Sequence, residues 1–308
     1  SFPNDGIHSG HQFYSRLFGE MQEKLQPSFR YKLDKKQNPT VSINTNLQLL
    51  QEAHNVLEDE WENLFYVYRL IKTTGNHKQL IKLVDCLSLY LIFRGEWSIL
   101  ESWYDQGIQA AEIISDRESI ASYQSELGWL AEERGNSERA EQYYNLALNN
   151  WRGITSPFGE ALTVFRLGWL YHTRGIWDEA RHAFERSLEI YEELDHPIGI
   201  ANATLGLGGV FESLKEWDKA EGYIKRALSI YSQIGDSTGV ASAYHHLGQL
   251  AGAQKNLDLA REYFLKAFEL FQKAGDKQSL AKAEKSLGNL NIFSGDIKTG
   301  LEHLMTAQ

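Results

Sequence analysis

The fold of this chain is decided by residues 161–200, which read ALTVFRLGWLYHTRGIWDEARHAFERSLEIYEELDHPIGI. The pattern of this block recurs every 40 residues from Ala121 to the end of the chain, and the blocks align without a gap. A Leu-Gly pair marks one position of every block, as Leu127-Gly128, Leu167-Gly168, Leu207-Gly208, Leu247-Gly248 and Leu287-Gly288. A fixed period in this range is typical of a solenoid, in which each repeat packs on its neighbours.

Each block is predicted to form two helices joined by a tight turn. Apolar residues recur at three- and four-residue spacing in two runs, around Leu167–Tyr171 and around Ala180–Tyr191. This spacing places them on one face of a helix. Arg174-Gly175 separates the two runs, and glycine is typical of a helix end. The small residues Gly168 and Ala180 indicate that two helices approach closely, because larger side chains would force them apart.

Polar residues and prolines predict where the first helix of each block begins. Side chains at one repeat position can accept hydrogen bonds from free backbone N–H groups. These residues are Asp116, Ser156, Asp236 and Asp276. Pro157 and Pro197 follow at the first helical position, where a missing N–H costs nothing.

These linked positions resemble the tetratricopeptide repeat. The family's small, glycine and aromatic positions match as Leu167, Gly168, Tyr171, Gly175, Ala180, Phe184 and Ala227. The family's usual unit has about 34 residues, so this chain is similar to the long-repeat subclass, in which both helices are extended. The resemblance implies an all-α, right-handed solenoid of stacked antiparallel helix pairs. The chain departs from the family at Lys215 and Lys255, which replace the turn glycine, and at Asn291, which replaces an aromatic residue.

Composition and charge narrow the classes of function. The 308 residues are 42% hydrophobic and carry a net charge of −10. The chain is therefore not disordered, and its acidity argues against a nucleic-acid backbone as the main partner. The single Cys86 excludes an internal disulfide and suits a reducing compartment. No apolar run approaches the ~18 residues of a membrane span. We therefore expect a cytoplasmic protein that binds neither nucleic acid nor a membrane.

The order of regular and irregular blocks predicts three parts. Residues 1–56 hold non-repeat helices and a linker with prolines and basic residues. Residues 57–120 keep the 40-residue frame but are degenerate, because Glu60 and Leu100 occupy positions that are small elsewhere. Residues 121–308 form the regular array, whose last repeat is incomplete.

The front section carries a second resemblance. Glu62-Asn63-Leu64, followed by Arg94-Gly95-Glu96-Trp97, is similar to the region after the nucleotide-binding and winged-helix modules of STAND-type signalling ATPases. The similarity covers residues 12–111. It implies that the chain is the sensor half of such a protein, because the sequence contains no Gly-x-x-x-x-Gly-Lys-Ser/Thr motif. A free-standing adaptor or assembly scaffold is the alternative.

The last block stops before its second helix is complete. Ile297, Leu301 and Met305 then lack a following repeat to cover them, although solenoids normally end in a polar capping helix. We expect either that the chain is cut from a longer one or that this end packs on something. An uncovered apolar helix face seeks a partner, so self-association through Ile297–Gln308 is one expectation.

A search for catalytic and metal-binding patterns finds none that is convincing. The sequence has no Gly-x-Ser-x-Gly, no His-Glu-x-x-His and no cysteine pair. Arg166 and His172 have the loose spacing of a motif found in some helical ribonucleases. The residues between them belong to the repeat consensus, so chance explains this spacing. A helical nuclease is nevertheless kept as the third alternative. His245 and His246 face different sides of a helix, so they are poorly placed to bind one metal ion. We expect neither enzymatic activity nor a cofactor.

The remaining candidate is a binding surface along the first helices of the blocks. Phe165, Trp169 and His172 form a stripe away from Leu167 and Tyr171. By resemblance to the family, this stripe lines a groove that binds a protein or peptide segment. The predicted binding residues are Trp129, Glu132, Phe165, Trp169, His172, Asn202, Leu205, Glu212, His245, Gln249, Lys285 and Asn289. Tryptophan is common among binding hot spots, but Trp129 and Trp169 would alternatively seal adjacent helices.

Overall fold

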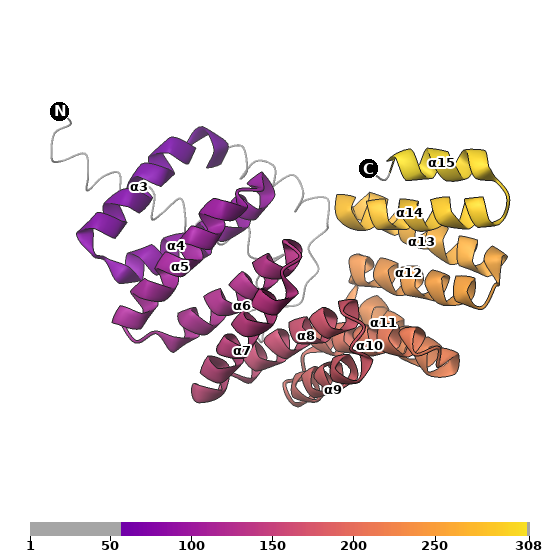
Figure 1. Cartoon of the computed structure of the whole chain (residues 1–308), viewed down its shortest axis with the longest axis horizontal. Coiled ribbons are helices and arrows are strands. Elements are labelled where there is room, and N and C mark those ends of the chain that lie inside the picture. The colour runs from indigo at the N-terminus through magenta and orange to yellow at the C-terminus, as the bar shows by residue number, and fades with distance from the viewer. Residues whose placement is uncertain (1–56, 307–308) are drawn as a thin grey trace. The chain divides into compact units, whose positions relative to one another are not determined.

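The computed structural model describes residues 57–306, and within this range every regular element is an α-helix (Figure 1). The helices are α3 Trp61–Thr74, α4 His77–Arg94, α5 Trp97–Ile113, α6 Arg117–Glu133, α7 Ser137–Gly153, α8 Pro157–Thr173, α9 Trp177–Glu193, α10 Pro197–Ser213, α11 Trp217–Ile234, α12 Ser237–Ala253, α13 Leu257–Ala274, α14 Lys277–Phe293 and α15 Ile297–Thr306. The predicted fold class, an all-α solenoid of stacked helix pairs, is confirmed.

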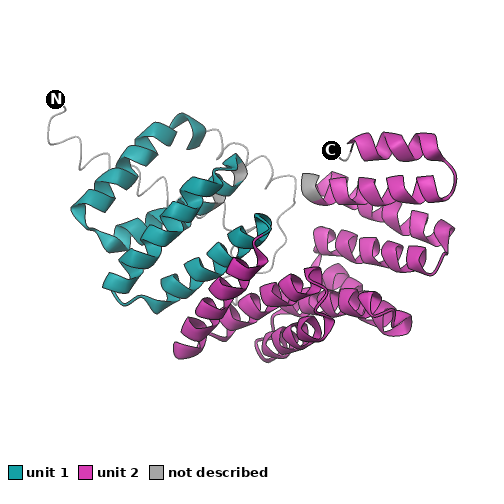
Figure 2. Cartoon of the chain, viewed as in Figure 1, with its two compact units in different colours: residues 1–135 teal, residues 136–308 magenta. Residues whose placement is uncertain are grey.

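The chain divides into two compact units, residues 1–135 and residues 136–308 (Figure 2). This division follows contacts within the chain, whereas the predicted boundary at residue 120 follows the regularity of the repeat and stays a prediction. The helices and linker predicted within residues 1–56 lie outside the described residues. In unit 1 the structure describes α3 to α6, and in unit 2 it describes α7 to α15.

In unit 2 each pair of helices packs together, and the second helix of one pair packs on the first helix of the next. Phe184 on α9 shows why glycine is needed on the two neighbouring helices. Its side chain is fully buried, and its ring lies against Gly168 on α8 and Gly206 on α10. A methyl group would stand 2.7 Å from the Phe184 ring at Gly168 and 2.6 Å from it at Gly206. Those distances are too short for any real carbon contact, so the two glycines are required by close helix packing.

The helix ends agree with most of the sequence predictions. Asp116, Asp236 and Asp276 each accept hydrogen bonds from backbone N–H groups of the first helical turn. Ser156 is a correction, because its side chain makes no capping bond and Pro157 alone marks the start of α8. Lys215 adopts the left-handed conformation, with φ of 60°. The turn therefore keeps its backbone shape even where glycine, which adopts this conformation without strain, is absent.

In unit 1, helix α3 begins at Trp61, after helical residues 57–59 and a turn at Glu60. Leu64, Tyr68 and Ile71 lie on one face of α3 and are all buried. Aromatic residues fill this unit, and Trp103 stacks on Tyr68 with ring centroids 4.1 Å apart.

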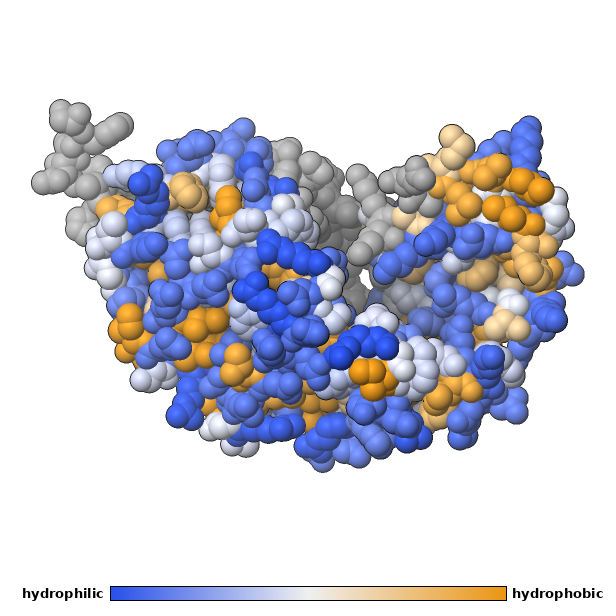
Figure 3. All heavy atoms as spheres, viewed as in Figure 1, coloured by the Kyte–Doolittle hydropathy of each residue, from blue (hydrophilic) through white to orange (hydrophobic). Residues whose placement is uncertain are grey.

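The C-terminal helix α15 has 10 residues, against 18 in α13. Ile297, Leu301 and Met305 on this helix are 58%, 51% and 75% exposed, and Phe293 at the end of α14 is 72% exposed. Figure 3 shows this apolar surface at the α14–α15 end of unit 2. The uncovered face that the sequence predicts is therefore present in the structure. None of the helices between residues 57 and 306 combines the length and apolar character that crossing a bilayer requires.

Candidate functional site

The first helices of successive pairs in unit 2, α8, α10, α12 and α14, are neighbours. They carry most of the predicted binding residues, and the centre of the arrangement is Trp169 on α8. Its indole is half-buried and packs on the core of the unit. Its ring contacts include Phe184, with centroids 5.3 Å apart, and His246 on α12, with centroids 6.5 Å apart.

The indole reaches α12 because α10 has no side chain in its path. Gly209 on α10 occupies the repeat position at which α8 has Trp169. A methyl group at Gly209 would lie 3.9 Å from Trp169 Cη2, 3.8 Å from His172 Nε2 and 3.7 Å from His246 Cε1. The rings of three residues therefore converge over one glycine, and we refer to Trp169, His172, Gly209, Glu212 and His246 as the Trp169 cluster.

Phe165 extends the aromatic surface one turn towards the start of α8. Its ring lies 6.4 Å from Trp169 and 5.7 Å from Phe184 between centroids, and it is half-buried like Trp169. Both aromatics therefore seal the core on one side and present part of their surface on the other. Sealing of the core is therefore observed, while the binding role of these aromatics stays a prediction.

His172 is fixed by two polar contacts to α10. Its Nε2 lies 3.3 Å from the Gly209 carbonyl oxygen and 3.1 Å from Ser213 Oγ. A carbonyl oxygen only accepts, so this geometry favours the tautomer that carries the proton on Nε2. Burial lowers the pKa of His172 below its ordinary value. A neutral imidazole held in this way joins α8 to α10.

A second histidine stands beside an acid in the same cluster. His246 Nδ1 lies 3.5 Å from Glu212 Oε2, and both side chains are about four-fifths buried, with 19% and 20% exposed. The Nδ1 atom is buried and makes no hydrogen bond within residues 57–306. The contact is therefore an ion pair whenever the imidazole is protonated, without the geometry of a hydrogen bond.

His245 points to a different neighbour, as the sequence predicts for adjacent helical residues. Its Nε2 lies 3.0 Å from Ser286 Oγ on α14. Burial lowers the pKa of His245 to about 4, with a further lowering from His246 and Lys282. The part of the chain from 57 to 306 contains no group of three or more side chains suited to a metal ion.

The other predicted residues of unit 2 fall into two classes. Asn202 and Leu205 serve the packing, because Asn202 Oδ1 accepts a 2.6 Å hydrogen bond from Tyr231 and Leu205 is only 6% exposed. Gln249, Lys285 and Asn289 are exposed along α12 and α14. The surface available beside the Trp169 cluster is therefore polar towards α14.

The two predicted residues of unit 1 lie on α6. Trp129 is half-buried, and its ring meets the ring of Trp97 edge to face, with centroids 5.9 Å apart. Glu132 is also half-buried, one turn further along the helix.

Sequence reasoning missed Gly209, Ser213 and His246 as members of this site. Gly209 could have been found from the repeat frame, because the same position holds Trp129 and Trp169 in the two earlier blocks and glycine leaves that space empty. His246 was considered only as a metal ligand.

Comparisons with known proteins agree with this architecture. Tetratricopeptide repeat models match residues 166–194 and the overlapping ranges 199–273 and 239–307. Tetratricopeptide repeats are thus present in unit 2. No curated protein matches the sequence.

Solved structures show the same fold at low sequence identity. The apo form of RapI is 12% identical, with a TM-score of 0.66, and covers 96% of this chain and 96% of its own. A Rap protein complexed with competence and sporulation factor is 15% identical, with a TM-score of 0.64, and covers 98% of this chain and 86% of its own. BtubC from P. vanneervenii is 22% identical, with a TM-score of 0.55, and covers 68% of this chain and 89% of its own.

Proposed function

We propose that unit 2 binds a protein or peptide segment on the surface formed by Phe165 and the Trp169 cluster. The observation that carries this proposal is a pair of half-buried aromatic rings, braced by Phe184 and His246, beside the carboxylate of Glu212. The matching tetratricopeptide repeats and the fold shared with a Rap protein complexed with competence and sporulation factor support it.

The geometry suggests how such a segment would bind. Apolar side chains of the segment would cover the exposed parts of Phe165 and Trp169, which already lie in fixed positions on the core. A pre-formed surface lowers the ordering cost of binding. The exposed polar residues Gln249, Lys285 and Asn289 would fix the direction and register of the segment more than its affinity.

Affinity measurements on selected peptides test this proposal. Peptides are first selected from a random display library on the wild-type chain, and their dissociation constants are measured by calorimetry. Phe165→Ala and Trp169→Ala should each weaken binding about 30-fold or more, which is ~2 kcal/mol. Leu265→Ala removes an exposed apolar side chain from α13 and serves as the control. Unchanged affinity in both aromatic variants, or unfolding of the double variant, would refute the site.

The proposal assigns the chain no catalytic activity. In the nuclease alternative, His172 would act as an acid or base beside Arg166. Its Nε2 is instead engaged by Gly209 and Ser213. Unchanged integrity of a labelled single-stranded RNA after incubation with the wild type is the expected result.

We further propose that the chain is the sensor part of a STAND-type signalling ATPase in the cytoplasm. Arg94, one of the residues of that resemblance, contacts the segment just before Glu62, because it lies over the ring of Trp61 at 4.9 Å and pairs with Glu58 at 3.3 Å. A reducing compartment suits the lone thiol of Cys86. The full-length gene tests this context: an upstream phosphate-binding motif supports the sensor, and its absence supports a free-standing adaptor or scaffold.

The exposed apolar surface at α15 favours a second proposal, self-association of the chain. Ile297 and Leu301 occupy the surface that a following helix pair covers in the other repeats. Sedimentation of the wild type should therefore show concentration-dependent dimers, and the Ile297→Glu, Leu301→Lys double variant should be monomeric. A monomeric wild type at high concentration would contradict this proposal.

A further inference from the structure

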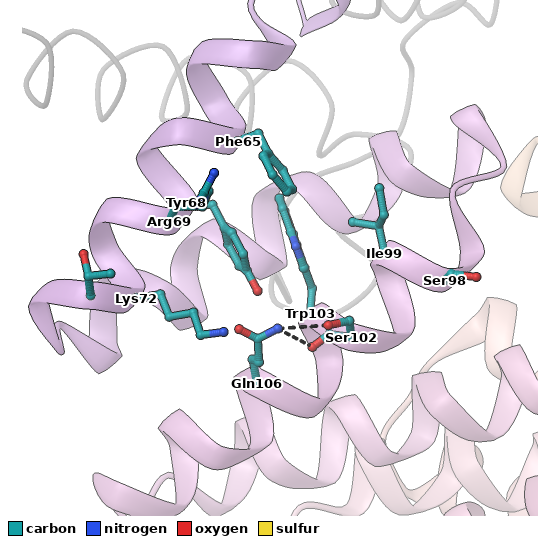
Figure 4. A pocket seen from close by; sticks show the side chains of 10 residues that line it. Phe65, Tyr68, Arg69, Lys72, Ser98, Ile99, Ser102, Trp103 and Gln106 are labelled. Carbon is teal, nitrogen blue, oxygen red and sulfur yellow. Dashed lines mark hydrogen bonds between the residues drawn. The ribbon is translucent and has the colours of Figure 1, made fainter.

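A hollow of about 710 Å³ lies in unit 1, between α3 and α5 (Figure 4). This volume is in the range of small-molecule sites. Three aromatic rings that contact one another form its wall, because the Trp103 centroid lies 6.5 Å from that of Phe65 and 4.1 Å from that of Tyr68, and the latter two lie 6.0 Å apart. None of the predicted binding residues lines this hollow, so it is a different site from the Trp169 cluster.

Two buried polar atoms beside the hollow make no hydrogen bond of ordinary geometry within residues 57–306. They are the hydroxyl of Tyr68, whose side chain is 4% exposed, and Gln106 Oε1. The other end of the same amide is fixed, because Gln106 Nε2 donates to the Ser102 carbonyl oxygen and to Ser102 Oγ, each at 3.0 Å. Buried polar groups are nearly always paired in native proteins. The Gln106 amide is also the polar neighbour of the Tyr68 hydroxyl, so a group bound in the hollow would compete with Gln106 for this hydroxyl.

The Tyr68 hydroxyl is a hydrogen-bond donor at physiological pH. Burial raises the pKa of Tyr68 to about 12. Figure 4 shows this hydroxyl, the Lys72 side chain and the Gln106 amide pointing towards the same part of the hollow. A group bound there would meet a neutral donor and a cation.

The charge of the hollow is positive. Lys72 and Arg69 contribute to its lining, no Asp or Glu does so, and neither cation makes an ion pair with another residue in the range 57–306. The charge at this repeat position varies, with Lys72, Glu112, Arg152 and Glu192 in successive blocks. Where Glu192 stands in the place of Lys72, it pairs at 2.8 Å with Arg226, which stands in the place of Gln106. Among the described residues of unit 1, Lys72 has no such partner.

We propose that this hollow binds a small organic anion with an aromatic body. The aromatic body would lie against Phe65 and Trp103, and its acidic group would pair with Lys72. The Tyr68 hydroxyl would donate a hydrogen bond to the same acidic group. A cation, a neutral donor and an aromatic wall within one hollow are the features that recognise such a molecule.

Two fluorescent probes of similar shape separate the anionic requirement from general apolar binding. 8-Anilinonaphthalene-1-sulfonate carries an aromatic body and an anionic group, and N-phenyl-1-naphthylamine carries the body alone. Both are titrated into the wild-type chain and into Lys72→Glu. The control Lys78→Glu makes the same charge change at an exposed residue of α4 that does not line the hollow.

Lys72→Glu should weaken sulfonate binding about tenfold or more, because it replaces an attraction by a repulsion. Binding of the neutral probe should stay unchanged, and Lys78→Glu should change neither. Phe65→Ala should weaken both probes, since it removes part of the wall. Equal sulfonate affinity in Lys72→Glu and Lys78→Glu, with both variants melting like the wild type, would overturn the proposal. Equal affinity in the two variants is also what binding of the sulfonate to the exposed apolar surface at α15 alone would give.

Discussion

Replacing Gly168 by alanine tests whether helix spacing in unit 2 is set by glycine. In a helix interior this substitution normally stabilises a protein by about 0.5–1 kcal/mol. Here the added methyl group would lie 2.7, 2.8 and 3.0 Å from three carbons of the Phe184 ring. The ring is fully buried and is held from the other side by Gly206, so it has no room to move. Overpacking of a core costs about 1–3 kcal/mol, and we expect a net loss of about 1–2 kcal/mol.

Gly222→Ala is the matched control, because Gly222 lies in helix α11, is exposed, and has no atom within 4 Å of an added methyl group. It should gain about 0.5–1 kcal/mol from helix propensity alone. Urea denaturation followed by circular dichroism measures both, and the midpoints are compared because repeat arrays depart from two-state unfolding. A Gly168→Ala midpoint at or above that of the wild type would refute the close-packing argument.

Three other substitutions test the packing and the buried imidazole of His245. Ala180→Leu should lower the melting temperature more than Trp177→Ala, since Ala180 is fully buried whereas Trp177 is half-buried at the turn; the reverse order would place Trp177 in the core. Between pH 6.5 and about 4, unfolded chains bind a proton at His245 that the folded chain does not, because burial lowers the pKa of His245 to about 4. As the pH is lowered through this range, the free energy of unfolding should therefore decrease by about 1.4 kcal/mol per pH unit. His245→Gln should reduce the difference between the urea midpoints at pH 7 and pH 5. An equal difference in the variant and the wild type would contradict the lowered pKa of His245.

The sequence predicted the fold well because the repeat displays its packing rule several times. The Leu167-Gly168 pair and a small residue at the position of Ala180 recur in every block from Ala121 onwards, and each recurrence marks a close approach between two helices. Local chemistry was less reliable. Ser156 looked like a cap and makes no capping bond, while Lys215 takes up a left-handed turn that favours glycine. In both cases the packing of the helix pair determines the backbone.

The binding surface was only partly predictable, because its contacts run between blocks. The indole of Trp169 crosses Gly209 to reach His246, two blocks along the chain. Reading one block at a time assigns each of these residues to its own helix and overlooks the cluster. Leu205 illustrates the opposite error, since it fits the stripe by spacing but is buried by its neighbours.

The charged hollow of unit 1 could have been noticed in the sequence frame. The charge at the position of Lys72 changes from block to block, with Glu112, Arg152 and Glu192 following it, and this variation is visible without a structure. The unpaired Tyr68 hydroxyl could not have been predicted, because it depends on how α3 and α5 face each other.

Photo-crosslinking from a single residue tests the location of the bound segment most directly. Replacing Gln249, which is exposed on α12, by p-benzoylphenylalanine places a crosslinker beside the proposed surface, and the same replacement at Gly222 places one on α11. A peptide selected on the wild type should crosslink from position 249 and not from position 222, and excess unlabelled peptide should suppress the product. Crosslinking from position 222 alone, or equally from both positions, would contradict a binding site on the surface of the Trp169 cluster.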